Sequence, residues 1–307
     1  MHWSRPFCSC SELQELLRLV GFSVEIHQLT NGPLSGCLDA VQSGAIAHLT
    51  ISSNQGLMYI GEPSKNYMNF SIERGNVGEF TKDHGIEFGD NSISGFCSSK
   101  TEIFFSLSPG SVAHHICVPK ALLLDTVNKL YGLEGLMFLE QNHTCRLSKI
   151  HKERIWELTK YARTNPEPGI EIKLIVQLLE SIFGESVTTS ETPALDIVTR
   201  FVQQAKKFGG PKPLSVSDIA AQLYTSKTTL SDQLKKLTGL SPSVFLDMCY
   251  LEQARNALSD PLDKRSVAQI GKDYGLGTRF SSKYLKKYGE SPSATKQRLK
   301  PLQLECL

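Results

Sequence analysis

The first part of the chain carries short apolar runs that alternate with clusters of small and polar residues. The clearest runs lie at residues 45–51, 57–60 and 102–107, and clusters of Gly, Asn, Pro, Asp and Ser lie at residues 31–33, 89–91 and 108–110. Short apolar runs separated by frequent turn signals are typical of the strands of a β-sandwich or barrel. We therefore predict a β-rich region over residues 22–118.

The pattern then changes to two stretches with helical spacing, at residues 120–131 and 147–183. Asn-Pro-Glu-Pro-Gly at 165–169 interrupts the second stretch, because proline ends a helix. The last part carries an apolar stripe made of Ile170, Leu174, Ile175, Leu178, Leu179 and Ile182. Such a stripe is a packing face, and the pattern fits two roles equally well: closing the first domain or joining two subunits.

A polar segment, GESVTTSETP at residues 184–193, separates this region from the rest of the chain. Small and polar residues closed by a proline are typical of a linker between domains. Beyond the segment, apolar residues recur three and four positions apart in segments 215–223, 227–237, 242–258, 267–274 and 280–288. We predict a first domain over residues 1–183, a linker at 184–193 and a helical second domain over 194–307.

The second domain contains an internal repeat. GLSP at 239–242 recurs as GESP at 289–292, and the apolar positions that precede it recur as well. Each copy reads as a short helix, a tight turn and a second helix that stops at glycine, which predicts helix-turn-helix units at about 215–239 and 266–289. A connecting helix over 242–259 would be about 27 Å long. This length suits two helices that enter major grooves one turn of B-DNA apart, about 34 Å.

Charge is divided unevenly between the two domains. The net charge of the whole chain is only +2, but residues 194–307 hold 18 Lys and Arg against 10 Asp and Glu, whereas residues 1–193 hold 15 against 21. The second domain therefore carries a net charge of +8 and the rest of the chain −6. A basic domain joined to an acidic one indicates a nucleic-acid-binding module attached to something else.

Residues 214–299 resemble the DNA-binding domain of AraC/XylS-family transcriptional regulators. The resemblance rests on Asp218-Ile219-Ala220, Gly239-Leu240-Ser241-Pro242, Leu251-Glu252-Gln253-Ala254-Arg255 and Gly289-Glu290-Ser291-Pro292. It implies an N-terminal β-rich effector or dimerisation domain. The expected fold class is then α+β with two domains: a cupin-like barrel or sandwich with trailing helices, and an all-α domain with two helix-turn-helix units joined by a helix.

This sequence departs from the family pattern at a few positions. The turn before Phe280 is two residues shorter than usual, and Leu276 stands in it where the family usually has Phe. Tyr250 replaces a common Arg and Gly271 a common Ala. We therefore expect the second unit to dock at a different angle or to hold mainly phosphates.

Side chains expected to contact bases lie on the exposed side of each second helix. Leu230, Leu234 and Leu237 face the core, which places the residues between them on the opposite, N-terminal face that enters a groove. The predicted base contacts are Thr228, Ser231 and Asp232 in the first unit, positions on which the family's base contacts also fall, and Thr278, Arg279, Ser281 and Ser282 in the second. For Asp232 the alternative is an acidic side chain that merely solvates the surface.

Lysines near the ends of these helices are expected to contact phosphates, since a flexible point charge positions the protein without reading sequence. They are Lys227, Lys235, Lys236, Lys283, Lys286 and Lys287. The alternative is a solubilising surface. Equivalent lysine-rich faces in both copies of the repeat favour double-stranded DNA as the partner.

Candidate metal-binding and catalytic residues are few. All eight histidines precede residue 152, and His114-His115-Ile116-Cys117 is the one cluster with ligand chemistry. On a strand His114 and Ile116 would share one face and His115 and Cys117 the other, so at most two could reach one metal. The pair Cys8-Ser9-Cys10 lacks a partner pair at zinc spacing, and the eight cysteines show no disulfide framework. We predict reduced thiols, no catalytic residues, no metal ligands and no cofactor.

Three hypotheses remain open for the function. The first is a DNA-binding transcriptional regulator that responds to a small-molecule effector in the β-rich domain; as an activator it would contact RNA polymerase, and it would form a homodimer. The second is a cupin-type metalloenzyme with a DNA-binding tail. The third is a regulator controlled by a protein partner or by cysteine oxidation. No apolar run has the length of a membrane span and no signal peptide is evident, so we expect a cytoplasmic protein that is not an enzyme.

Overall fold

The computed structural model describes residues 2–75, 81–84, 86–87, 91–99, 102–165, 167, 169–184, 195–206 and 213–298 of the 307-residue chain. The chain divides into two compact units, one made of residues 1–26 and 35–192 and the other of residues 27–34 and 193–307. Apart from Gly184, the predicted linker lies outside the described residues. No helix in the described ranges combines the length and the apolar character needed to cross a membrane.

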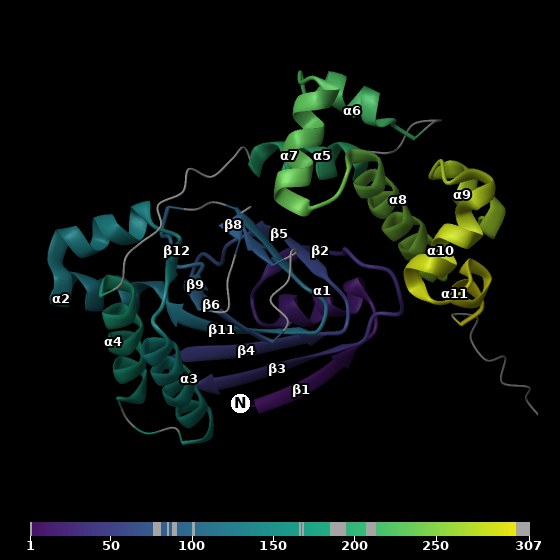
Figure 1. Ribbon diagram of the computed structural model, residues 1–307. Coiled ribbons are helices and arrows are strands. Elements are labelled where there is room, and N and C mark those ends of the chain that lie inside the picture. Colours follow the sequence, from purple (N-terminus) through teal and green to yellow (C-terminus); the bar gives the residue numbers. More distant parts are fainter. Residues whose placement is uncertain are drawn as a thin grey trace, which may run out of the picture. The chain divides into compact units, whose positions relative to one another are not determined.

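The first unit contains two sheets (Figure 1). The seven-stranded sheet has the order β1 (His2–Phe7), β3 (Gly36–Ser43), β4 (Ile46–Ser53), β11 (Ser111–Pro119), β6 (Tyr67–Gly75), β9 (Ser92–Ser94) and β12 (Thr144–Arg146). The five-stranded sheet has the order β2 (Ser23–Gln28), β5 (Leu57–Glu62), β10 (Ile103–Leu107), β7 (Lys82–Asp83) and β8 (Ile86–Glu87). The predicted β-rich domain is confirmed, as two sheets rather than a closed barrel.

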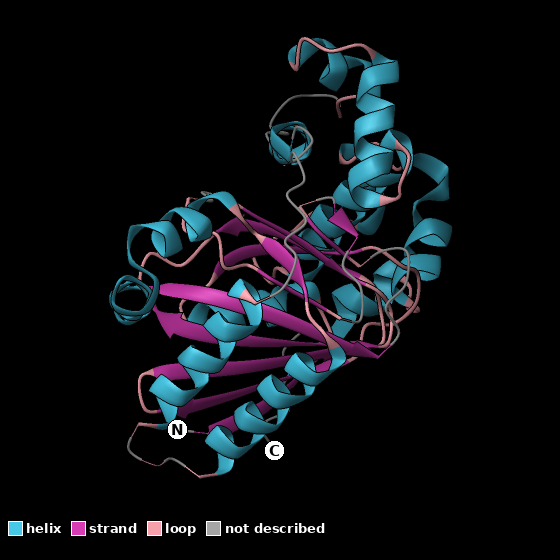
Figure 2. Ribbon diagram, turned by 60° about the vertical axis from the view of Figure 1, so that its left-hand side comes forward, coloured by secondary structure: helices cyan, strands magenta, loops and turns pink. Residues whose placement is uncertain are grey.

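The seven-stranded sheet turns one face toward three helices, α2 (Lys120–Gln141), α3 (Lys149–Thr164) and α4 (Ile170–Phe183). Figure 2 shows α3 and α4 side by side across the strands. Ile116 and Val118 of β11 enter the same buried core as the apolar stripe of α4. Because all six stripe residues are buried, and all but Ile170 belong to this core, the stripe closes the first domain and is not a subunit interface.

Two parts of the first unit were not predicted from the pattern. The N-terminal residues form β1, which pairs with β3, and α1 (Cys10–Leu19), whose first turn is capped by the Ser9 hydroxyl accepting from the Glu12 amide. Helix α2 continues ten residues beyond the predicted end at Tyr131, to Gln141, because the chain passes Gly132 at φ 61° and ψ −151° and then resumes helical geometry. Glycine tolerates this backbone geometry, and in the sequence it looked like a helix end.

Over residues 195–206 and 213–298 the second unit consists of helices and their connections, as predicted; residues 27–34, which also belong to this unit, include the end of strand β2. Its helices are α5 (Leu195–Lys206), α6 (Val216–Gln222), α7 (Lys227–Thr238), α8 (Pro242–Ser259), α9 (Val267–Asp273), the 3-10 turn η1 (Gly277–Arg279), α10 (Phe280–Tyr288) and α11 (Pro292–Arg298). The Phe201 ring of α5 packs on the Phe245 ring of α8 with centroids 5.5 Å apart, which joins α5 to the connector helix.

Local sequence signals set the helix ends of the first helix-turn-helix unit. Ser215 and Asp218 form a reciprocal capping box at the start of α6, and the Ser226 hydroxyl accepts from the Thr229 amide at the start of α7. Gly239 ends α7 in the left-handed region at φ 74°, and Pro242 occupies the first turn of α8. Each signal is local, so these boundaries follow from the sequence alone.

Candidate functional site

Helices α7 and α10 present equivalent faces. Gly239 and Gly289, at φ 74° and 73°, end the two helices 50 residues apart. The buried positions keep the same spacing: Leu230, Leu234, Leu237 and Thr238 in α7 correspond to Phe280, Tyr284, Lys287 and Tyr288 in α10. Each unit therefore holds its second helix by one face and turns the other outward.

The outward face of α7 carries the predicted base contacts. Thr228 and Asp232 are exposed and Ser231 is partly buried, all on the N-terminal half of the helix and off the buried leucine face. Hydroxyl and carboxylate groups in this position offer both donors and acceptors to base edges. Lys227 at the start of α7, and Lys235 and Lys236 in its last turn, are exposed as well.

The second helix-turn-helix unit repeats this arrangement, but its second helix begins differently. Thr278, Arg279, Ser281 and Ser282 are exposed over η1 and the first turn of α10. The first turn is 3-10, no side chain caps it, and Gly277 has φ 56°. Between Ile270 and Phe280 the chain is one residue shorter than between Ile219 and Leu230. The start of α10 is therefore less well fixed than the start of α7.

The lysines of α10 do not all face solvent. Lys286 is exposed, and the partly buried Lys283 donates to the Asp247 carboxylate of α8 at 2.6 Å. Lys287 is only 5% exposed, so its prediction as a phosphate contact disagrees with the structure. Its position corresponds to the buried Leu237 of α7, and its ammonium donates to the Gln28 carbonyl instead of facing solvent.

Two departures from the family pattern have packing explanations. A Cβ added to Gly271 would lie 2.5 Å from the Phe280 ring, so glycine in α9 makes room for a large aromatic residue in α10. The first helix-turn-helix unit uses the opposite combination, a larger residue in the first helix and a smaller one in the second: Ala220 with Leu230. Tyr250 donates its hydroxyl to the Leu214 carbonyl at 2.9 Å and so ties α8 to the segment before α6.

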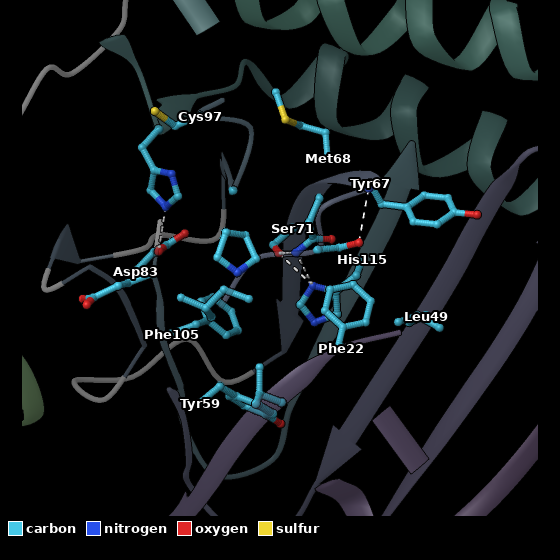
Figure 3. A pocket seen from close by; sticks show the side chains of 18 of the residues that line it. Phe22, Leu49, Tyr59, Tyr67, Met68, Ser71, Asp83, Cys97, Phe105 and His115 are labelled. Atoms are coloured by element: carbon cyan, nitrogen blue, oxygen red, sulfur yellow. Dashed lines mark hydrogen bonds and ion pairs between the residues drawn. The ribbon is translucent and has the colours of Figure 1, made fainter. Parts of the chain in front are cut away.

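A pocket in the first unit is lined by residues of both sheets. It holds about 950 Å³ of empty space when its opening is included. Leu49, Ser71 and His115 line it from the seven-stranded sheet, and Tyr59 and Phe105 from the five-stranded sheet. In Figure 3 Asp83 and Cys97 lie on one side of the pocket and His115 and Phe22 on the other. A largely apolar cavity with a few polar groups is the usual form of a small-molecule site.

One wall of the pocket holds a cluster of the buried Asp83 and His84 with the partly buried His143. The Asp83 Oδ1 atom lies 2.5 Å from His84 Nδ1 and 2.9 Å from His143 Nε2. Burial opposes charge on Asp83, but His143 and His84 hold the pKa of its carboxyl well below the usual range. Burial likewise disfavours a charged His143, yet the Asp83 carboxylate raises its pKa to about 9.

Cys97, on the same wall, has a perturbed thiol. It donates to the Glu140 carbonyl at 3.1 Å and lies 3.3 Å from the Ser99 hydroxyl. Burial opposes the thiolate, while His143 and Ser99 stabilise it and lower the pKa of Cys97 to about 7. No disulfide joins the seven cysteines among the described residues, Cys97 included; Cys306 lies outside them.

The histidine cluster predicted from sequence is split between the two faces of β11. His115 lines the pocket, where its Nδ1 atom lies 2.7 Å from the Ser71 hydroxyl. His114 points to the helix side, stacked on His48 at 6.0 Å and against Trp156 at 5.5 Å. The alternation predicted for residues 114–117 is confirmed, so these side chains do not converge on one metal.

Sequence reasoning missed Asp83, His84 and His143 because 60 positions separate Asp83 from His143. The strand pairing of β7 with β10, and the return of the chain from α2 into β12, bring them together. The adjacent Asp83-His84 pair was a signal, but nothing local pointed to the third residue.

Comparison with known proteins supports the assignment of the second unit. Residues 219–298 match the family model HTH_18, which describes a helix-turn-helix domain. No curated protein matches the chain. The family model covers both helix-turn-helix units from within α6 to the end of α11.

Solved structures of regulators also align with the chain. A transcriptional regulator with an AraC-type DNA-binding domain from Chromobacterium violaceum is 28% identical, covering 36% of this chain and 99% of that one, with a TM-score of 0.32. The AraC-like transcriptional activator CuxR is 14% identical, covering 83% and 95%, with a TM-score of 0.39. ToxT from Vibrio cholerae is 12% identical, covering 97% and 99%, with a TM-score of 0.34.

The identification rests on the family match together with the paired helices α7 and α10 and the connector α8. Residues 219–298 form a helix-turn-helix domain of the family that HTH_18 describes.

Proposed function

We propose that the protein regulates transcription by binding a specific DNA sequence with α7 and α10 in two successive major grooves. The observation that carries this proposal is the equivalence of the two helices, which end at Gly239 and Gly289 in the same geometry and expose matching polar faces. Helix α8 spans 18 residues between the units, about 27 Å at 1.5 Å per residue. This separation is compatible with grooves about 34 Å apart once the offsets of the helices are added.

The two helices have different roles in this proposal. Helix α7 reads bases through Thr228, Ser231 and Asp232, because its first turn is fixed by the Ser226 cap. Helix α10 contributes mainly affinity, since its first turn is uncapped and 3-10. Its exposed set of Thr278, Arg279, Ser281 and Ser282 contacts bases or sugar less selectively, and Lys286 contacts phosphate.

We propose that the first unit binds a small-molecule effector in the pocket lined by residues of both sheets. The pocket combines apolar walls from Leu49, Tyr59 and Phe105 with a few polar groups, among them Ser71 and His115. Such a site binds by apolar burial and sets orientation with its polar groups. An effector changes DNA affinity only as far as it binds the two states of the protein differently.

A homodimer is a further part of the proposal. Helix α2 exposes Leu130 at 52% before the break at Gly132, and Leu133 and Met137, four positions apart, at 71% and 47% after it. Light scattering at micromolar concentration tests this point. Loss of a dimer in Leu133→Glu, with unchanged tryptophan fluorescence, supports an α2 interface, and an unchanged mass in that variant contradicts it.

The experiment that tests the main proposal is selection of bound fragments from the genome of the source organism. The purified protein is expected to enrich a small set of fragments with a common motif, and Thr228→Ala is expected to change that motif at one position. Enrichment without a shared motif would contradict sequence-specific regulation. The genes beside the sites then indicate the class of effector to test.

A further inference from the structure

Three side chains with metal-ligating atoms converge on one point in the pocket wall. Asp83, His84 and His143 each offer one atom, and these atoms all lie within 4.8 Å of one another. Two of them, His84 Nδ1 and His143 Nε2, approach the same atom, Asp83 Oδ1, at 2.5 and 2.9 Å. Among the described residues this is the one group of at least three such side chains.

The hydrogen bond on the far side of His84 determines which ring nitrogen faces the cluster. His84 Nε2 lies 2.9 Å from the Glu102 carbonyl oxygen, which only accepts, so Nε2 carries a proton. On a neutral ring, Nδ1 then presents a lone pair to Asp83 Oδ1, which carries lone pairs as well. Two acceptors at 2.5 Å require a cation between or beside them, either a proton or a metal ion. A ring N–H donated to a carbonyl is also the usual outer contact of a metal-bound histidine.

The backbone holds the cluster in place at an energetic cost. His84 has φ 51°, a left-handed conformation that a non-glycine residue adopts only at an energetic cost. Its amide donates to the Phe104 carbonyl at 2.7 Å, which fixes it at the end of β7. The third member of the cluster, His143, lies between α2 and β12. The three side chains thus come from two separate parts of the first unit; Asp83 and His84 are buried, and the His143 side chain is 12% exposed.

We propose that Asp83, His84 and His143 bind one divalent first-row transition metal ion, with zinc or ferrous iron as the best match to the donors. Two imidazole nitrogens and one carboxylate oxygen on one side of an ion form the set found in open zinc sites and in iron sites with two histidines and one carboxylate. The remaining coordination positions face the pocket, where a bound molecule with an oxygen or nitrogen donor would complete the shell. This proposal concerns the first unit only and does not depend on DNA binding.

The competing explanation is a proton-bridged group in which one or both imidazoles are charged against Asp83. Both explanations account for the short contacts, but only the metal site predicts saturable binding of one ion per chain. The two are therefore separated by direct metal titration.

The test uses the full-length protein purified without a histidine tag, stripped with chelator and titrated with Zn²⁺ and with Co²⁺. Because the exposed Cys8 lies beside Cys10, the titration is done in a Cys8→Ser background. We expect one equivalent of either ion, a higher melting temperature of the first unit by tryptophan fluorescence, and visible Co²⁺ bands without thiolate charge transfer. In Asp83→Asn and in His143→Gln the affinity should fall at least about 100-fold.

The matched control is His151→Gln, which removes a histidine of the same unit outside the cluster and should keep wild-type affinity. Absence of stoichiometric binding in the Cys8→Ser protein overturns the proposal without reference to any variant. Equal affinity in Asp83→Asn, His143→Gln and the control overturns it as well. Variants are compared only after their tryptophan fluorescence matches that of the Cys8→Ser protein. The cobalt spectrum of the Cys8→Ser protein distinguishes nitrogen and oxygen ligands from thiolate without use of any further variant.

Discussion

Lys283 donates to the Asp247 carboxylate at 2.6 Å, so one of the lysines expected on DNA forms an ion pair between α10 and α8. Both side chains are partly exposed, and such a pair contributes little to stability. It does occupy the ammonium, however, and it sets the orientation of α10 on the connector helix. The lysines of the two helix-turn-helix units are therefore not equivalent in their contacts, although they occupy similar positions in the repeat.

The first prediction compares Lys235 with Lys283. Lys235→Ala should weaken binding to all duplexes alike and flatten the dependence of log affinity on log salt by about one unit, because one released counterion is lost. Lys283→Ala should have a smaller effect on that slope, since Asp247 already neutralises part of its charge. Fluorescence anisotropy over a salt series checks this. Equal slopes for the two variants would contradict the distinction.

The second prediction concerns base reading by α7. Thr228→Ala or Ser231→Ala should cost about 1 to 3 kcal/mol on the selected operator and little on random DNA, because a hydroxyl contact to a base edge is lost. Competition binding with every single-base change of the operator locates the affected position. A loss that is equal on operator and random DNA would assign these hydroxyls to the backbone instead.

The third prediction tests the exchange of small and large residues between the units. Gly271→Ala gains up to about 1 kcal/mol of helix propensity, yet it should destabilise the second unit because its Cβ would lie 2.5 Å from Phe280. The double variant Gly271→Ala, Phe280→Leu recreates the Ala220 and Leu230 pair of the first helix-turn-helix unit. It should recover most of the lost stability. Hydrogen exchange over 267–288 measures both. Faster exchange in the double variant than in Gly271→Ala would refute the packing explanation.

The fourth prediction concerns pH and the buried His48. Burial, with a contribution from Arg163, lowers its pKa to about 4, whereas the unfolded chain titrates near 6.5. Below 6.5 the unfolded state binds the extra proton, so the stabilisation present at neutral pH is lost as pH falls toward 4, by up to about 3 kcal/mol. Burial also lowers the pKa of the neighbouring His114, which adds in the same direction.

Urea unfolding followed by tryptophan fluorescence measures this term, since both tryptophans, Trp3 and Trp156, lie in the first unit. His48→Phe removes the titrating group, and the ring nitrogens of His48 make no hydrogen bond to the described residues, so the apolar ring is tolerated. The variant should lose less stability than wild type between pH 7 and pH 5. Parallel pH profiles would show that His48 is not the responsible group.

The helical second unit could be predicted well because its signals are local. Ser226, Gly239 and Pro242 fix helix ends within a few residues of themselves, and the leucine spacing in α7 identifies its buried face. The same register, moved by 50 residues, places Lys287 on the buried Leu237 position, and this information was present in the sequence. Lys287 was nevertheless predicted to contact phosphate, because lysine is rarely buried and the residue type was given more weight than the position in the repeat.

The pocket wall could not be predicted, because its residues meet only through long-range pairing. His143 joins Asp83 and His84 after the chain has passed through β10, β11 and α2. Alternation along β11 correctly predicted that the His114 and His115 side chains lie on opposite faces of the strand. It did not predict which of the two faces lines a cavity. A period-two pattern assigns faces relative to one another, and the partner of each face depends on the whole sheet order.

The most direct test of the account is a hydroxyl-radical footprint on a selected genomic fragment, for wild type and for variants of each reading helix. Wild type should protect two patches on one face of the duplex, centred about 10 base pairs apart. Thr228→Ala with Asp232→Ala should weaken one patch, and Arg279→Ala with Lys286→Ala the other. A single patch, or two patches that every variant weakens equally, would contradict two helices in successive grooves.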